Sequence, residues 1–181
     1  MQFLPTKIPD LILVGVPKFG DHRGFFMETY HEQKFSDGGI SAIFIQDNHA
    51  SSQKNILRGL HYQLKFPQGK LIRCIQGEIL DIAVDIRKSS PTFGQWVGEI
   101  LSSENARQLY VPPGFAHGYV VRSDNAEVEY KCTELYHPED EYGILWNDPE
   151  LAIHWPVKNP IVSSKDQAFK RLSEIPIEDL L

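Results

Sequence analysis

The chain contains little cysteine and no long apolar run near its N-terminus. Cys74 and Cys132 are the only cysteines among 181 residues, and both lie in strand-like segments without the spacing of a disulfide framework. We therefore expect reduced, buried thiols of an intracellular protein. The longest apolar run near the N-terminus, residues 11–14, is far shorter than the roughly 20 residues of a membrane span. No secretory pattern is present, so the sequence favours a cytoplasmic protein without a membrane partner.

Motifs of two large enzyme classes are also missing. There is no Gly-rich phosphate loop and no G-x-G-x-x-G after a strand-like run, which argues against a nicotinamide enzyme. There is no G-x-S-x-G, the nucleophile motif of the α/β-hydrolases. Positive charge is not in excess either. The net charge of -6 argues against a nucleic-acid partner, but it leaves room for a local basic pocket for one phosphorylated small molecule.

What the chain does contain is a series of short strand-like runs separated by glycine, proline and asparagine. Apolar residues at 41% and charged residues at 23% are ordinary globular values, and no linker or repeat divides the chain, so we expect a single domain over residues 1–181. The predicted strands are residues 11–16, 24–30, 43–48, 71–76, 79–85, 97–101, 108–111, 117–122 and 127–133. Short helices are predicted at 31–36 and 167–172, and an irregular tail over 135–160. This pattern indicates an all-β sandwich or barrel.

Two segments have the spacing of the paired motifs of a small double-stranded β-barrel, the cupin class. They are residues 58–63 followed by Lys70, and residues 112–118. Metal-binding barrels of this class place His-x-His in the first motif, then a Glu seven residues before a Gly. Here Gln63 stands at the second His position and Lys70 at the Glu position, before Gly77. A protonated lysine cannot ligate a metal, so we expect no metal and, in its place, proton transfer on an anionic intermediate.

His61 and Lys70 are the first candidates for this chemistry. His61 shares a strand face with Gln63, while Tyr62 points away. Because imidazole titrates near neutrality, His61 could be a general base, although a structural or metal-binding histidine fits the residues as well. Lys70 could be a solvated surface lysine; pointing inward, it would need an anion beside it.

Three further candidates each have two interpretations. Asp166 could orient His61 and raise its basicity, or it could cap the short helix that follows, and no spacing links the two residues. Tyr130 could be a catalytic phenol or an aromatic core residue. Tyr136 could pack in the core or form a wall against a flat ligand.

Several polar residues could recognise a ligand. Arg23 and Arg58 are either surface charges or guanidinium groups that grip phosphate. Gln46 and Asn48 lie two apart and so face the same way, which suits the edge of a base or sugar but equally an edge-strand hydrogen bond.

Taken in order, these segments resemble the dTDP-4-dehydrorhamnose 3,5-epimerase family. Each match alone is weak, but the ordered set is specific and covers the chain from about residue 10 to residue 170. The matching segments are residues 21–24 with Phe26 and Glu28, then 46–48, 57–63, 70–71, 81–87, 90–94, 111–118, 130–133, 146–149 and 163–166. Two residues depart from the family pattern: Tyr119 stands where Phe is commoner, and Tyr142 where smaller residues are frequent.

The resemblance implies a jelly-roll barrel, a homodimer with strands exchanged between subunits, and no metal or organic cofactor. It implies that His61 is the general base paired with Asp166, that Tyr130 is the general acid, and that Lys70 steadies an oxyanion. Positions that resemble the family's nucleotide-sugar contacts are Arg23, Glu28, Gln46, Asp47, Asn48, Arg58, His117, Glu141 and Lys165, and Lys70 and Tyr136 would join them.

The implied substrate is dTDP-4-dehydro-6-deoxy-D-glucose, converted to dTDP-4-dehydro-L-rhamnose by inversion at carbons 3 and 5. Three alternatives stay open. The same residues suit an epimerase of one carbon in a related deoxysugar nucleotide. A cupin metalloenzyme is a different class, which Gln63 and Lys70 argue against. A non-catalytic sugar-binding module would not need His61, Asp166 and Tyr130 together.

Overall fold

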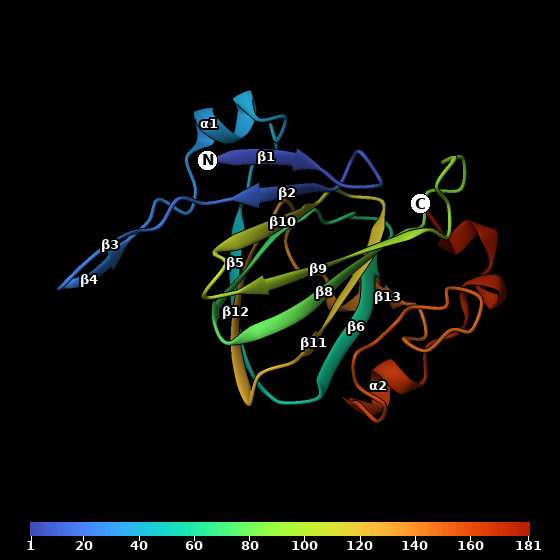
Figure 1. Cartoon of the computed structure of the whole chain (residues 1–181). Coiled ribbons are helices and arrows are strands. Elements are labelled where there is room, and N and C mark those ends of the chain that lie inside the picture. Colours follow the sequence, from blue (N-terminus) through green and yellow to red (C-terminus); the bar gives the residue numbers. More distant parts are fainter.

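Two facing β-sheets make up most of the computed structural model, which describes residues 1–181 (Figure 1). The first sheet has the strand order β1-β2-β10-β7-β12-β5. Its strands are β1 (Gln2–Pro5), β2 (Ile12–Gly15), β10 (Arg107–Val111), β7 (Lys70–Gln76), β12 (Asn125–Cys132) and β5 (Gln46–Gln53). The second sheet has the order β13-β6-β11-β8-β9, with β14 beside β6. Its strands are β13 (Glu141–Gly143), β6 (Ile56–Gln63), β11 (Phe115–Val121), β8 (Glu78–Asp85), β9 (Trp96–Ser102) and β14 (Ile161–Val162).

The remaining elements are short. A separate hairpin of β3 (Phe19–Asp21) and β4 (Gly24–Phe26) projects away from the sheets as an arm (Figure 1). The helices are α1 (Glu32–Asp37), α2 (Ser164–Gln167), and the 3₁₀ turns η1 (Pro138–Asp140), η2 (Leu172–Glu174) and η3 (Ile177–Asp179). None of them has the length and apolar character that crossing a membrane requires.

Strand β8 illustrates how the sequence builds the second sheet. Ile79 and Ala83 belong to a cluster of 16 buried residues between the two sheets. Ile82 and Val84 point the opposite way, into a second cluster that includes Leu172 and other residues of the C-terminal segment. Because the sheet is covered on both faces, its central strands need buried side chains at nearly every position, and β11 is buried throughout.

The prediction of an all-β fold is confirmed, with one qualification. The two sheets share no strand, so they form an open sandwich and do not close into a barrel. The predicted irregular tail over 135–160 is also confirmed in most of its length. It contains only the turn η1 and the three-residue strand β13, which adds to the edge of β6.

The predicted helix at 167–172 is wrong in position. Ser163 caps a helix that begins earlier, because its hydroxyl oxygen accepts the backbone N–H of Asp166 at 3.1 Å. The chain then leaves the helix, and Lys170 forms a parallel bridge with Ile144. Asp166 therefore lies inside α2 and is not its cap.

Two predicted strands also have different bounds. The run at 24–30 stays extended in a paired strand only as far as Phe26, and the run at 43–48 becomes a strand only at Gln46. Ile43 and Ile45 are both exposed and lie outside any strand, although the Ile45 N–H donates to the carbonyl of Cys132 in β12 at 2.9 Å. Apolar residues alone could not reveal at which residue the paired strand begins.

Candidate active site

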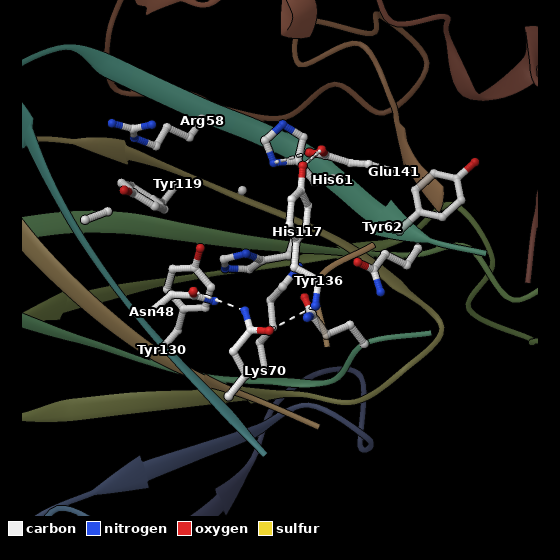
Figure 2. Close-up of a pocket in the computed structure, with 15 residues that line it drawn as sticks. Asn48, Arg58, His61, Tyr62, Lys70, His117, Tyr119, Tyr130, Tyr136 and Glu141 are labelled. Atoms are coloured by element: carbon white, nitrogen blue, oxygen red, sulfur yellow. Dashed lines mark hydrogen bonds and ion pairs between the residues drawn. The ribbon is translucent and has the colours of Figure 1, made fainter. Parts of the chain in front are cut away.

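A cavity of about 380 Å³ lies between the two sheets, with side chains from both turned into it (Figure 2). The lining residues come from β5, β6, β7, β11, β12 and β13 and from the connections beside them. They are Gln46, Asn48, Ala50, Arg58, His61, Tyr62, Gln63, Gln68, Lys70, His117, Gly118, Tyr119, Tyr130, Tyr136 and Glu141.

An irregularity in β6 turns both Arg58 and His61 into this cavity. Strict alternation would place residues 58 and 61 on opposite faces. Strand β11 pairs His117 with His61 but Tyr119 with Arg58, so β6 has one extra residue at this point, as in a β-bulge. Gly59 permits it: its φ is 127°, and a Cβ there would lie 2.6 Å from the Cα of Gly118.

His61 forms a hydrogen-bonded pair with Asp166, which α2 brings to the edge of β6. The His61 Nε2 lies 2.8 Å from an Asp166 carboxylate oxygen, and the other oxygen accepts the backbone N–H of Gly59 at 3.1 Å. Burial is the largest single influence and would raise the pKa of Asp166, but the interactions with His61, Gly59 and Ser163 together outweigh it and hold the pKa below its ordinary value. With the Nε2 proton directed at this carboxylate, His61 Nδ1 is left as a free acceptor.

A carboxylate faces that free nitrogen. Glu141 Oε1 lies 3.9 Å from His61 Nδ1, and the Tyr136 hydroxyl donates to Glu141 Oε2 at 2.6 Å. Lys165 forms an ion pair with the same Oε2. Burial would raise the pKa of Glu141, yet the bonds from Lys165 and Tyr136 keep it lowered, so the group is a carboxylate near neutral pH.

Lys70 and Tyr130 stand on the opposite wall, on adjacent strands of the first sheet. The Lys70 ammonium has no hydrogen bond or ion pair with any residue of the chain, and burial lowers its pKa. Burial also raises the pKa of Tyr130 to about 12, so its hydroxyl is protonated near neutral pH. A proton donor and a lysine without a partner in the chain therefore face His61 across the cavity (Figure 2).

A second histidine–carboxylate pair joins β11, which lines the cavity, to the neighbouring strand β8. His117 Nε2 lies 2.9 Å and 3.0 Å from the two carboxylate oxygens of Asp81, which is completely buried. The paired carboxylate holds the imidazole of His117 in one orientation toward the cavity.

Three side-chain amides organise the rim of the cavity. Gln46 donates to Asn48 Oδ1 at 3.1 Å and accepts the backbone N–H of Tyr136 at 2.9 Å, so the two residues do face the same way. Gln63 donates to the carbonyls of Phe66 and Leu135 and accepts the backbone N–H of His137 at 2.9 Å. Gln63, which stands at the second histidine position of the metal motif, thus links the loop after β6 to the loop before η1 by hydrogen bonds. The structure has no group of three or more His, Cys, Asp or Glu side chains that could hold a metal ion.

The chain is similar to known proteins over almost its whole length. The family model described as dTDP-4-dehydrorhamnose 3,5-epimerase matches residues 5–174. The protein of that name from Shigella flexneri is 54% identical over 168 residues, which are 92% of this chain and 93% of the relative. The chain belongs to the dTDP-4-dehydrorhamnose 3,5-epimerase family.

Solved structures of family members have the same fold. A dTDP-6-deoxy-D-glucose-3,5-epimerase from Legionella pneumophila, crystallised with dTDP-4-keto-L-rhamnose, superposes with a TM-score of 0.96 at 49% identity, covering 99% of this chain and 96% of that one. A 3'-monoepimerase from Streptomyces bikiniensis, solved with dTDP-quinovose, has a TM-score of 0.87 at 30% identity, covering 93% of this chain and 87% of that one. The fold therefore accommodates both double and single epimerases.

Most of the residues predicted from the family pattern come together at the cavity. Those that line it are Gln46, Asn48, Arg58, His61, Lys70, His117, Tyr130, Tyr136 and Glu141. Asp166 joins them through His61, and Lys165 through Glu141.

Three predicted residues lie apart from the cavity of the single chain. Arg23 lies on the arm and pairs with Asp21, and Glu28 follows the arm and pairs with Lys34. Asp47 is exposed, between the inward-facing Gln46 and Asn48, and pairs with Lys131.

Sequence reasoning did not include Asp81, Gln68 or Tyr119 among the site residues. Asp81 carried a signal, since it is the one acidic residue within the apolar run 79–84 of β8. Tyr119 was visible only as a departure from the family pattern. Gln68 lies in a connection, where no periodicity indicates direction.

Proposed function

We propose that the protein converts dTDP-4-dehydro-6-deoxy-D-glucose to dTDP-4-dehydro-L-rhamnose by inverting carbons 3 and 5, as a step of dTDP-L-rhamnose biosynthesis. The observation that supports this most directly is the His61–Asp166 pair facing Tyr130 across a cavity, with the unpaired Lys70 ammonium on the Tyr130 side. Family membership, with relatives of that name, supports the same activity.

In this proposal His61 is the general base. The ketone at carbon 4 acidifies the hydrogens on carbons 3 and 5, so each can leave as a proton to give an enolate. His61 Nδ1 removes the proton, and Asp166 stabilises the imidazolium that forms at the other nitrogen. This pairing also keeps the correct nitrogen free before the reaction.

Lys70 is the group that stabilises the enolate oxygen. An ammonium without a partner in the chain is available for a charge that appears only during the reaction. Its burial strengthens the attraction, because the effective dielectric constant inside the protein is lower than in water.

Tyr130 returns the proton from the face opposite His61, and this inverts the carbon. The phenol loses one proton while the imidazole gains one. The enzyme returns to its starting state when the imidazolium releases its proton to water and the phenolate takes a proton from water. The same cycle at the second carbon completes the double epimerisation. The sugar is neither oxidised nor reduced, so the residues of the chain suffice for the proton transfers.

The remaining cavity residues would hold the nucleotide. Arg58 offers a guanidinium for phosphate, while Gln46, Asn48, His117, Tyr136, Glu141 and Lys165 offer polar groups for the sugar and the base. We propose these as contacts of the dTDP portion, with one domain over residues 1–181 acting in the cytoplasm.

We also propose a homodimer in which the arm reaches the cavity of the partner subunit. Its aromatic side chains are largely exposed in the single chain: Phe19, Phe25 and Phe26 are 66%, 61% and 71% exposed. Exposed aromatic residues in such a group are typical of an interaction surface. The arm carries Arg23, and Glu28 follows it, so exchange would bring the partner's copies of these two predicted contacts to the nucleotide.

Subunit complementation tests the exchanged arm. His61→Ala damages the cavity and Arg23→Ala damages the arm, so each variant alone should have little activity. In a mixed dimer, one cavity would combine an intact His61 with an intact arm from the other chain. Recovery of activity after refolding the two variants together supports exchange, and no recovery in dimers of verified mixed composition contradicts it.

NMR in deuterium oxide with the purified protein tests the main proposal. Deuterium at carbons 3 and 5 of the substrate, with dTDP-L-rhamnose formed when the following reductase is added, is the expected result. Label at one carbon alone would place the protein with the single epimerases, as in the Streptomyces bikiniensis structure. No label at either carbon would contradict the proton-transfer proposal.

A further inference from the structure

Gln63 ends strand β6 at the wall of the cavity, and the residue is 4% exposed. Its Nε2 donates to the carbonyls of Phe66 and Leu135, at 2.7 Å and 3.1 Å. Its Oε1 accepts the backbone N–H of His137 at 2.9 Å. An amide nitrogen has two protons and both are used here, so Gln63 has no donor left for a ligand. Any contribution of Gln63 to binding therefore goes mainly through the groups to which it is bonded.

Two of these three bonds hold the chain on either side of Tyr136. The Leu135 carbonyl belongs to the peptide group that precedes Tyr136, and the His137 N–H belongs to the peptide group that follows it. One amide side chain therefore restrains the backbone on both sides of a single residue. The third bond, to Phe66, anchors the same amide to the loop that follows β6.

Tyr136 lies in a part of the chain that no regular structure supports. Residues 134–137 lie outside every helix and strand, so no ladder of backbone hydrogen bonds holds them. Tyr136 lines the cavity and is 49% exposed. Its own N–H donates to Gln46 at 2.9 Å, and its hydroxyl donates to Glu141 at 2.6 Å (Figure 2). Without Gln63, only these two hydrogen bonds would restrain Tyr136.

A ligand contact that is already in place strengthens binding. A group that becomes ordered only on binding loses conformational freedom at that moment, and this loss reduces the affinity. Here the hydrogen bonds of Gln63 order the backbone around Tyr136 when the chain folds, before any ligand is present.

We propose that Gln63 is a positioning residue for nucleotide binding: its amide fixes the backbone on both sides of Tyr136 and so presents the Tyr136 ring to the ligand in one orientation. The inference rests on the nucleotide recognition proposed above, in which Tyr136 is a contact of dTDP. Gln63 acts through Tyr136 and does not itself bind the nucleotide.

Gln63→Met keeps the length of the side chain and removes the amide, and a double-mutant cycle with Tyr136→Ala tests the proposed role. The dissociation constant of dTDP, measured by calorimetry, should rise about tenfold in Gln63→Met, the effect of leaving the backbone of one residue to be ordered on binding. In the Tyr136→Ala background the same change should have no further effect, because the ring that Gln63 positions is gone. An equal rise in both backgrounds would mean that Gln63 acts on the nucleotide by another route, and would overturn the proposal. An unchanged dissociation constant in either single variant would overturn it too.

Asn105→Leu is the matched control. The Asn105 amide also forms three hydrogen bonds with the backbone, to Ile100, Ser102 and Arg107, in the connection between β9 and β10. Both variants should lower the melting temperature, but only Gln63→Met should weaken dTDP binding. Weaker binding in Asn105→Leu as well would show that lost stability alone lowers the affinity, and would contradict the proposal. Gln63→Leu repeats the test if the methionine variant does not fold.

The same measurements distinguish this inference from the proposed epimerase activity. If the wild-type protein binds no dTDP, both fail. If it binds dTDP and shows the coupling between residues 63 and 136 but exchanges no deuterium into the substrate, the activity fails and the positioning role stands. If deuterium enters the substrate but Gln63→Met binds dTDP as tightly as wild type, the activity stands and the positioning role fails.

Discussion

The two faces of the second sheet differ in what they carry, although they alternate along the same strands. The inner face presents Arg58, His61 and His117 to the cavity. The outer face presents Leu60, Ile82 and other apolar side chains to the C-terminal segment. Only the inner face carries the polar groups of the site, while the outer face binds the segment that delivers Asp166 to His61. The packing of one face therefore determines the chemistry of the other.

The first sheet makes a useful contrast. Lys70 and Tyr130 also point into the cavity, but neither has a partner from the C-terminal segment, and burial determines the direction of both pKa shifts. Truncating His61 on the second sheet should therefore also leave Asp166 without its partner. Truncating Lys70 or Tyr130 on the first sheet should remove only the role of that side chain.

His61→Ala should have the largest effect. Loss of the general base is expected to lower kcat by about 10²–10⁴-fold, while dTDP affinity stays close to wild type. Deuterium exchange and calorimetry measure the two quantities. His49→Ala, at an exposed histidine paired with Glu127, is the control and should retain full activity. Turnover within about tenfold of wild type would show that another group is the base.

Lys70→Ala should lower kcat more than it changes the substrate dissociation constant. The ammonium stabilises a charge that develops only after proton removal, so its loss acts on the transition state. Steady-state kinetics with a separate dTDP titration measure this split. Lys54→Ala, at an exposed lysine paired with Asp124, should have no effect. A pure loss of affinity in Lys70→Ala would instead identify Lys70 as a phosphate contact.

Tyr130→Phe should separate proton removal from inversion. His61 can still take the proton and return it from its own face, so deuterium should enter the substrate faster than the inverted product appears. Comparing the label in recovered substrate with the amount of product measures the ratio. Equal slowing of exchange and inversion would argue against Tyr130 as the acid.

Leu172→Ala tests the outer face of the second sheet. Leu172 is 8% exposed within the outer cluster, so its truncation should lower the free energy of unfolding by about 2–5 kcal/mol. Denaturant unfolding measures the loss. Ile177→Ala, at a residue that is 63% exposed, is the control and should change stability by less than about 0.5 kcal/mol. Similar losses in both variants would mean that the packing against the sheet is not what holds this segment.

Acid pH should weaken the His61–Asp166 pair, and this is the smallest effect expected. The pKa of Asp166 is lower in the folded protein than its ordinary value, so its contribution to stability is present above the unfolded pKa. That contribution is lost as the pH falls through the folded pKa. The difference in melting temperature between wild type and Asp166→Asn should therefore shrink below about pH 4. A difference that stays constant there would contradict the shift.

How much could be predicted from the sequence depends on the range of the interaction. Periodicity showed that His61 and Gln63 share a face, and both line the cavity. The same periodicity would have placed Arg58 on the other face. The bulge in β6 turns Arg58 into the cavity, and that bulge depends on the close approach of Gly59 to Gly118 on the next strand. Side-chain direction is local in a regular strand and ceases to be local where the register shifts.

Distant partners were the least predictable feature. The pairing of His61 with Asp166 followed from family resemblance, not from spacing, and the helix that carries Asp166 begins earlier than its residues suggested. The hydrogen bonds between Gln63 and the peptide groups on either side of Tyr136 had no signal in the sequence at all.

By itself the sequence determined the all-β class, the shared strand face of His61 and Gln63, and membership of the epimerase family, because alternation and short motifs are properties of neighbouring residues. The tertiary structure decided which segments meet: that the C-terminal segment delivers Asp166, that two strands of the first sheet oppose His61 with Tyr130 and Lys70, and that Arg58 shares their cavity. Those contacts depend on strand register and on the packing of both faces of a sheet, which no local pattern encodes.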